Sequence, residues 1–235
     1  MDFLADNIRK AHPGTRVEVL DALHGYQSLQ PLWVQVVKFG QLLLDLVSET
    51  NSNIHLIGYS QGNLLKIKID FKIYTDYLRL LFPHFMKDNL FRLFYSSFGQ
   101  KFSVANYWKD PHHIDLYLNY SSYLAIINNE TANPQSFVFK DNFLKLKQLV
   151  LIGGSDDGVI TPWQSSHFGY YNASENITEM ADQEVNNRVY IKDSFGLKTL
   201  HSRNAISTYS VPGVYHLNWH KNITIFYKYI LPHLT

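Results

Sequence analysis

The sequence predicts an α/β fold with a mostly parallel sheet. Apolar or alternating runs at residues 15–20, 54–57 and 149–152 are typical of strands, and a long helical pattern separates the first two. Strand, helix and strand in this order indicate parallel βαβ units rather than a meander of hairpins. At 235 residues and 46% hydrophobic composition, the chain is expected to form a single domain over residues 1–235.

Each element of this fold has its own local signal. Residues 2–11 are expected to form a helix, and residues 15–20 alternate with the period of a strand. Pro31 suits the first turn of a helix that continues to about Glu49, and a short buried strand over residues 54–57 follows.

The later part of the chain continues the same pattern. Residues 76–82 have helical periodicity, and residues 149–152 form a short apolar strand. Residues 205–211 could form a last strand and residues 224–231 a last helix.

Composition excludes several classes of function. Lys plus Arg total 21 and Asp plus Glu 20, so the net charge of +1 favours neither nucleic acid nor an acidic membrane as partner. The chain has no cysteine, which excludes disulfides and thiolate catalysis. Its first residues lack the apolar region of a signal peptide, and no run of about 18 apolar residues predicts a transmembrane segment.

The Asn-x-Ser/Thr sequons point to the secretory pathway. Roughly two or three would be expected by chance at this composition. A cytosolic protein with chance sequons is the alternative to a secretory protein whose signal peptide lies outside this chain. The candidate glycosylation sites are Asn119, Asn129, Asn172, Asn176 and Asn222.

Residues 58–62 (GYSQG) match the G-x-S-x-G pattern of a nucleophile elbow. In such an elbow the serine stands on a sharp strand-to-helix turn, where flanking glycines allow close packing. The apolar run at residues 54–57 supplies the preceding strand, and the N–H that follows Ser60 would help to bind an oxyanion. An ordinary structural turn is the alternative interpretation.

A serine nucleophile needs a base and an acid that orients it, and in this class of hydrolase the chain order is Ser, Asp/Glu, His. Asp156 and Asp157 directly follow the strand at residues 149–152, although Asp-Asp-Gly is also good turn chemistry. His216 lies between the possible last strand and the last helix, and a surface histidine is its alternative.

Two groups of histidines suggest a metal, but weakly. His112 and His113 lie near Asp110 and Asp115, and His220 lies near His216. There is no HExxH motif, and adjacent side chains in an extended segment point apart. No metal and no cofactor are therefore expected.

Longer motifs resemble the palmitoyl-protein thioesterases, and within that family the second lysosomal type. The resemblance covers most of the chain and is strongest in LVLIGGSDDGVITPWQSSHFGYY at 149–171. The other matching stretches are HPGT at 12–15, SLQPLWVQV at 28–36, IGYSQG at 57–62, TDYLRLLFP at 75–83, NYWKDPHH at 106–113, LYLNYSSYLAIIN at 116–128 and KDSFGLKTL at 192–200.

This resemblance implies an α/β-hydrolase fold with a helical insertion after the elbow. It also implies hydrolysis in the lysosome of a fatty acyl thioester, either an acyl-CoA or an S-acylated protein. Ser60 would be the nucleophile, Asp157 the acid and His216 the base, and Gln61 would lend its backbone N–H to the oxyanion hole. Asp157 matches the family's aspartate better than Asp156 does.

The chain departs from the family pattern in two places. A first strand, whose His-Gly loop supplies a second oxyanion N–H, is expected to be absent, which leaves the fold incomplete at its N-terminus. After the elbow, residues 63–74 alternate apolar and charged residues where the family has a helix, a strand and a loop. Impaired activity is therefore one expectation, and the alternatives are a lipase or carboxylesterase of the same fold and an inactive isoform that binds lipid or a partner.

Overall fold

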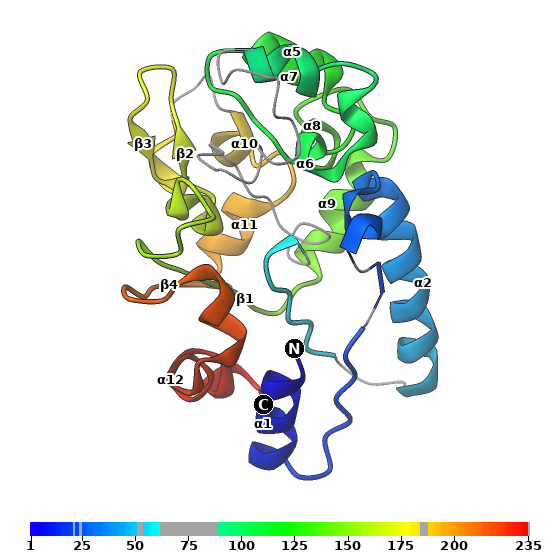
Figure 1. The fold of residues 1–235 in the computed structure, drawn as a ribbon, viewed down its shortest axis with the longest axis vertical. Helices are drawn as coiled ribbons and strands as arrows, with labels where there is room; N and C mark the ends of the chain where they lie inside the picture. Colours follow the sequence, from blue (N-terminus) through cyan, green and yellow to red (C-terminus); the bar gives the residue numbers. More distant parts are fainter. Residues whose placement is uncertain (21, 24, 51–53, 62–88, 184–187, 235) are drawn as a thin grey trace.

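The computed structural model describes residues 1–235 except 21, 24, 51–53, 62–88, 184–187 and 235 (Figure 1). In the described part, short helices outnumber strands, and the predicted helix at residues 76–82 lies outside it, as do residues 63–74. The elements and their bounds are α1 (Asp2–Ala11), η1 (Gly25–Leu29), α2 (Leu32–Thr50), α5 (Leu90–Phe94), η3 (Gly99–Lys101), α6 (Ser103–Asn106), α7 (Ile114–Tyr120), α8 (Leu124–Ile127), α9 (Ser136–Leu144), β1 (Leu149–Gly153), η4 (Trp163–His167), β2 (Tyr170–Tyr171), β3 (Ile177–Thr178), η5 (Met180–Asp182), α10 (Arg188–Ile191), α11 (Leu197–Ser202), β4 (Ile206–Ser210), η6 (His216–Lys221), α12 (Ile223–Ile225), η7 (Phe226–Ile230) and η8 (Leu231–His233).

Strands β1 and β4 form a parallel pair. Leu149 lies opposite Ile206 and Gly153 opposite Ser210. Parallel neighbours need a long crossover, and here the connection contains α10 and α11. The predicted strands at residues 149–152 and 205–211 are confirmed, and the chain is an α/β protein with a small parallel sheet.

The two other predicted strands were wrong. Residues 15–20 and 54–57 are extended without strand assignment, because neither has a ladder partner among the described residues. Val17 and Ile57 instead pack against a cluster formed by Leu4, Ile8 and Phe226. Apolar alternation reports which side chains are buried, whereas a strand also needs a neighbouring backbone.

The predicted helices at both ends of the chain are confirmed. Helix α1 covers residues 2–11, and α2 begins one residue after Pro31. The expected C-terminal helix is a succession of α12, the π-helical turn η7 and η8. In the part of the chain that is described, no helix is long and apolar enough to cross a membrane.

Two hydrophobic cores hold the loop that follows β1. Leu149 and Leu151 of β1 belong to one core, together with Phe195, Leu197 and Leu200. Ile160, at the far end of the loop, belongs to the other core, around α2, α5 and α6. Burying a leucine-sized side chain contributes about 1.5–3 kcal/mol, so both ends of this loop are firmly anchored.

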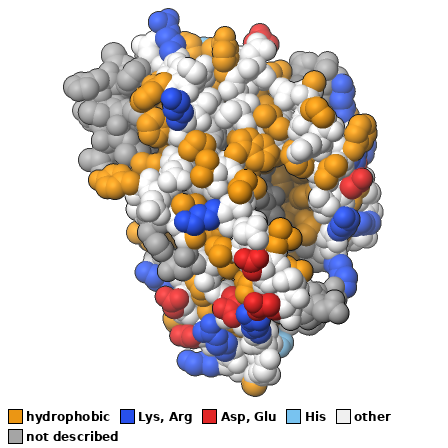
Figure 2. All heavy atoms as spheres, turned by 90° about the vertical axis from the view of Figure 1, so that its right-hand side faces the viewer, with side chains coloured by type: hydrophobic (Ala, Val, Ile, Leu, Met, Phe, Trp, Pro, Cys, Tyr) orange, Lys and Arg blue, Asp and Glu red, His pale blue; other side chains and the backbone are white. Residues whose placement is uncertain are grey.

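The face on the α2 side carries apolar side chains around a hollow, whereas charged groups of both signs are interspersed below it (Figure 2). The lower end of the molecule contains α1 (Figure 1), where Arg9 pairs with Asp6 at 2.9 Å. Neither sign of charge dominates this face.

Candidate active site

Ser60 lies on a turn with a left-handed backbone. Its φ is +52°, a conformation that costs energy for a residue with a Cβ atom. Gln61, the next residue, is helical, while Gly62 of the motif lies outside the described residues. A left-handed serine next to a helical residue is one feature of a nucleophile elbow.

His216 brings its imidazole ring to Ser60. Its Nε2 lies 2.8 Å from the Ser60 Oγ, and the side chain is buried at the start of η6. Gly213, with a φ of +76°, turns the chain between β4 and this histidine. The distance is suitable for direct proton transfer from the hydroxyl group.

Asp157 lies on the other side of the ring, within the anchored loop. Its Oδ2 and Oδ1 are 2.9 and 3.0 Å from the His216 Nδ1. An ionised carboxylate only accepts hydrogen bonds, so the Nδ1 carries the proton of the neutral ring. The Nε2 is then left as the acceptor for the Ser60 hydroxyl group, which is the tautomer that a base requires.

The Asp157 carboxylate receives further hydrogen bonds. The backbone N–H groups of Val159 and Ile160 donate to Oδ1 at 3.0 and 2.7 Å, and the Trp219 Nε1 donates to Oδ2 at 2.7 Å. Burial raises the pKa of Asp157, but the hydrogen bonds from His216, Ile160 and Trp219 outweigh it, so this pKa lies below its ordinary value. The carboxylate is therefore charged.

Tyr59 also supports the histidine. Its hydroxyl donates to the backbone carbonyl of His216 at 2.7 Å, and its ring lies 5.3 Å from the imidazole. Burial, with a contribution from the charge of Asp157, raises the pKa of Tyr59, so the phenol stays a neutral donor. Sequence analysis missed this role because Tyr59 occupies a variable position of the G-x-S-x-G pattern.

Gln61 is anchored by residues from η1 and α2. Its Nε2 donates to the Ser28 carbonyl at 2.7 Å and to the Gln35 Oε1 at 2.9 Å. The hydroxyl of Ser103 on α6 donates to the same carbonyl at 2.8 Å. This network fixes the position of the backbone immediately after Ser60.

The two alternative site residues are not part of the Ser60–His216–Asp157 series of contacts. Asp156 is exposed, and its Oδ2 accepts from the Gly213 N–H at 2.8 Å. That hydrogen bond, with one from Ser155, lowers the pKa of Asp156. His220 packs on the Tyr59 ring at 4.6 Å, and burial lowers its pKa. The structure therefore brings Ser60, His216 and Asp157 together.

The histidines considered for a metal are separated. His112 faces Glu175 at 3.1 Å, whereas His113 faces Asp110 at 2.9 Å. Within the described ranges, no group of three or more His, Cys, Asp or Glu side chains could hold a metal ion.

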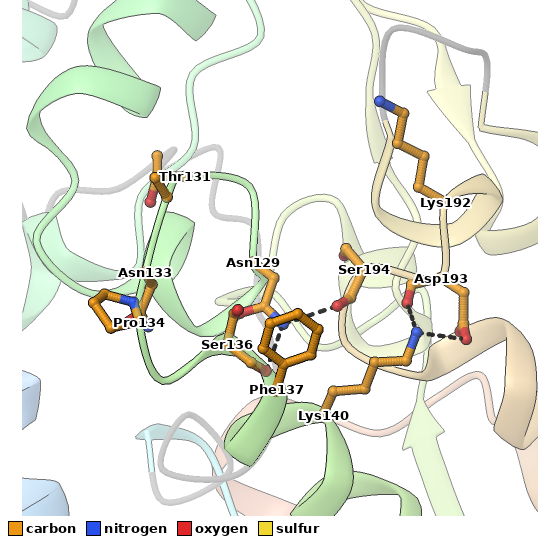
Figure 3. A pocket seen from close by; sticks show the side chains of 11 residues that line it. Asn129, Thr131, Asn133, Pro134, Ser136, Phe137, Lys140, Lys192, Asp193 and Ser194 are labelled. Carbon is orange, nitrogen blue, oxygen red and sulfur yellow. Dashed lines mark hydrogen bonds and ion pairs between the residues drawn. The ribbon is translucent and has the colours of Figure 1, made fainter.

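A shallow cavity of about 600 Å³ lies beside α9 (Figure 3). Asn129, Phe137 and Lys140 line it, together with Asp193 and Ser194. Lys140 already pairs with the Asp193 carboxylate at 3.0 Å. The charged groups of Lys140 and Asp193 in this lining thus already pair with each other.

The five sequons differ in their surroundings. Asn119 and Asn176 are exposed. Asn172 uses its Oδ1 in a turn before β3, and Asn222 uses its Oδ1 to cap α12. The Asn129 Nδ2 donates to the carbonyls of Ser136 and Ser194 at 3.0 and 2.8 Å, so both of its hydrogens are engaged.

Comparison with known proteins identifies relatives along the whole chain. Residues 71–216 match the family model Palmitoyl protein thioesterase. Lysosomal thioesterase PPT2 of Rattus norvegicus is 47% identical over 252 residues, which cover 99% of this chain and 82% of the rat protein. The protein of the same name from Homo sapiens is 46% identical with the same coverage. The lysosomal thioesterase PPT2 homolog of Drosophila melanogaster is 36% identical over 100% of this chain and 86% of its own length.

The alignment with the rat protein spans 252 residues, whereas this chain has 235, so the relative contains residues in the aligned stretch that have no counterpart here. The prediction of a family member with missing residues agrees with this difference in length. By both the family match and the identity to these relatives, the chain belongs to the palmitoyl protein thioesterase family.

Proposed function

We propose that this chain is a serine-dependent thioesterase that cleaves fatty acyl thioesters in the lysosome. The observation that carries the proposal is the continuous series of contacts from Ser60 to His216 at 2.8 Å and from His216 to Asp157 at 2.9 Å. Family membership and the names of the relatives, lysosomal thioesterase, support the substrate class and the compartment.

The proposal includes an α/β-hydrolase fold in a single domain over residues 1–235, with a helical insertion after the elbow. Its support is the parallel pair of β1 and β4, since Asp157 follows one strand and His216 the other. Carboxyl ends of parallel strands share one edge of the sheet, which is where this fold carries its acid and base.

In the first half of the reaction, the Ser60 Oγ attacks the thioester carbonyl carbon while the His216 Nε2 takes the hydroxyl proton. The carbon–sulfur bond then breaks, and the imidazolium gives its proton to the departing thiolate. The products are a free thiol and an ester between Ser60 and the acyl group. Asp157 holds the ring in the required tautomer and stabilises its charged form.

In the second half, His216 removes a proton from water, which attacks the acyl-enzyme ester. The free fatty acid leaves and Ser60 regains its proton from the imidazolium. The backbone N–H of Gln61 would stabilise the oxyanion in both halves, and losing one such donor typically costs 10²–10³ in rate. The anchored Gln61 side chain supports this role because it limits movement of that N–H.

Thiol release from palmitoyl-CoA by the purified chain tests the proposal. The wild-type chain should release thiol, and Ser60→Ala should lose at least about 10³-fold in kcat. A folded chain that releases no thiol, or a Ser60→Ala variant that remains active, would overturn the proposal. A palmitate ester of an alcohol, assayed in parallel, separates a thioesterase from a general esterase.

The chain offers a matched control at the adjacent position. Asp157→Asn should be nearly inactive, whereas Asp156→Asn, which removes an exposed carboxylate, should retain activity within a few-fold of wild type. Equal losses in the two variants would contradict the assignment of the acid.

A further inference from the structure

We propose that Trp219 is a positioning residue that holds the Asp157 carboxylate through its indole N–H and thereby sets the basicity of His216. The inference rests on the proposed function, because it assigns a further residue to the same site. It concerns a side chain that contacts neither the Ser60 hydroxyl nor the reacting carbonyl.

The Asp157 carboxylate is held by two parts of the chain, its own loop and η6, and the His216 Nδ1 lies 3.0 Å from Oδ1 as well as 2.9 Å from Oδ2. Oδ1 accepts from the backbone N–H groups of Val159 and Ile160, which belong to the aspartate's own loop. Oδ2 accepts from the Trp219 Nε1 at 2.7 Å and from the His216 Nδ1 at 2.9 Å, and both donors come from η6. Without the indole N–H, the histidine would be the one remaining side-chain donor to Oδ2.

The geometry of η6 explains why the indole reaches this carboxylate. A 3₁₀-helix has three residues per turn, so His216 and Trp219 lie on the same face. The backbone N–H of His216 donates to the Asp157 carbonyl at 2.8 Å, which fixes this face against the loop. The indole packs on the backbone at Gly154, where an added Cβ atom would lie 3.3 Å from the Trp219 Cη2.

The hydrogen bond has an electrostatic consequence for the base. The positive end of the indole N–H dipole partly offsets the carboxylate charge, which lowers the attraction between Asp157 and an imidazolium at His216. Among the described residues, Tyr59 and His220 are the other titratable groups beside this histidine, and a replacement at Trp219 leaves both side chains in the sequence. Removing the N–H should therefore make the imidazolium more stable.

The sharpest test replaces the Trp219 indole with benzothiophene, by incorporating 3-benzothienylalanine, which keeps the ring shape and removes the donor. Trp219→Phe, which also removes ring area, is a second variant made with the twenty standard amino acids. For the benzothiophene variant, kcat/KM for palmitoyl-CoA should fall about tenfold. The acid limb of the kcat/KM–pH profile should move upward by about half a pH unit.

Trp33 provides the matched control, because its Nε1 also donates a hydrogen bond, to the Ser122 carbonyl at 2.6 Å. The same benzothiophene replacement at Trp33 should leave the acid limb where it is. An unmoved limb in the Trp219 variant, or an equal shift in both variants, would show a merely structural role and overturn the proposal.

A second readout does not need enzymatic activity. In a Ser60→Ala background, the ¹³C signal of the Asp157 carboxyl group reports its titration directly. The benzothiophene replacement should raise the pKa of Asp157, and an unchanged titration would overturn the inference. If the wild-type chain proved inactive, the proposed function would fail while this measurement still decided the role of Trp219.

Discussion

Two carboxylates, the buried Asp157 and the partly buried Glu130, show what separates a candidate catalytic group from a structural one. Asp157 is bonded to His216, Trp219 and its own loop. Glu130 accepts from Lys109 at 2.7 Å and from the Tyr117 hydroxyl at 2.5 Å. Both carboxylates are thus well satisfied by buried donors.

The difference lies in the basic residue that pairs with each carboxylate. Lys109 is a cation whose side chain is 2% exposed and which lies 4.9 and 5.0 Å from the Tyr117 and Tyr170 rings. His216 can release and accept a proton, and its second nitrogen meets the Ser60 hydroxyl. A hydrogen-bonded acid therefore becomes a candidate for catalysis when its partner can act as a base and contacts a nucleophile.

The largest expected effect is on activity, where the two carboxylates should differ most. Asp157→Asn should lower kcat for palmitoyl-CoA by about 10⁴-fold, because the amide favours the wrong histidine tautomer. Glu130→Gln should leave kcat per folded molecule within about twofold of wild type. Titration of active sites with a fluorophosphonate gives the folded, competent fraction, and a large kcat loss in Glu130→Gln would refute the distinction.

The next effect is on stability and concerns the ion pair of Glu130. Lys109→Met leaves Glu130 buried without its cation and should cost about 3–5 kcal/mol in free energy of unfolding. Arg16→Met removes the exposed pairs of Arg16 with Glu18 and Glu49 and should change the free energy of unfolding far less, because water and salt screen exposed pairs. Urea unfolding followed by circular dichroism measures both, and similar costs for the two variants would contradict the structural role of Lys109.

A third buried titratable group, His167, extends the comparison because no carboxylate of the described residues pairs with it. Among the described residues nothing bonds its Nε2, and burial lowers its pKa from 6.5, opposed in part by a hydrogen bond with the Tyr209 backbone. Below pH 6.5 the unfolded chain therefore binds more protons than the folded chain, and stability falls as the pH drops.

His167→Gln should flatten this pH dependence, by up to about 1.4 kcal/mol per pH unit. The measurement is the free energy of unfolding between pH 7 and pH 5 (roughly the range that a histidine spans). The exposed His201→Gln serves as control, and an unchanged slope in His167→Gln would contradict the burial argument.

The smallest expected effect concerns glycosylation. Because both Nδ2 hydrogens of Asn129 are engaged (Figure 3), we expect this sequon to remain unmodified, whereas the exposed Asn119 is free to carry a glycan. In protein secreted from eukaryotic cells, Asn129→Gln should leave the glycan mass unchanged and Asn119→Gln should remove one glycan. A glycopeptide containing Asn129 would contradict this expectation.

Local sequence patterns correctly predicted several of the elements and the candidate nucleophile. The helix at residues 2–11 and the strands at 149–152 and 205–211 were foreseen from periodicity, and the G-x-S-x-G motif singled out Ser60. The strands expected at residues 15–20 and 54–57 were not formed, since pairing depends on a second backbone that no local pattern reports.

Residue types and their spacing were enough to indicate the family, the candidate groups and their chain order Ser60, Asp157, His216. The folded chain was needed to show that Trp219 donates to Asp157, that Tyr59 donates to the His216 carbonyl and that Asp156 accepts from Gly213. Hydrogen bonds act over about 3 Å. Which groups come that close is set by the packing of distant segments, and the chain order alone does not specify it.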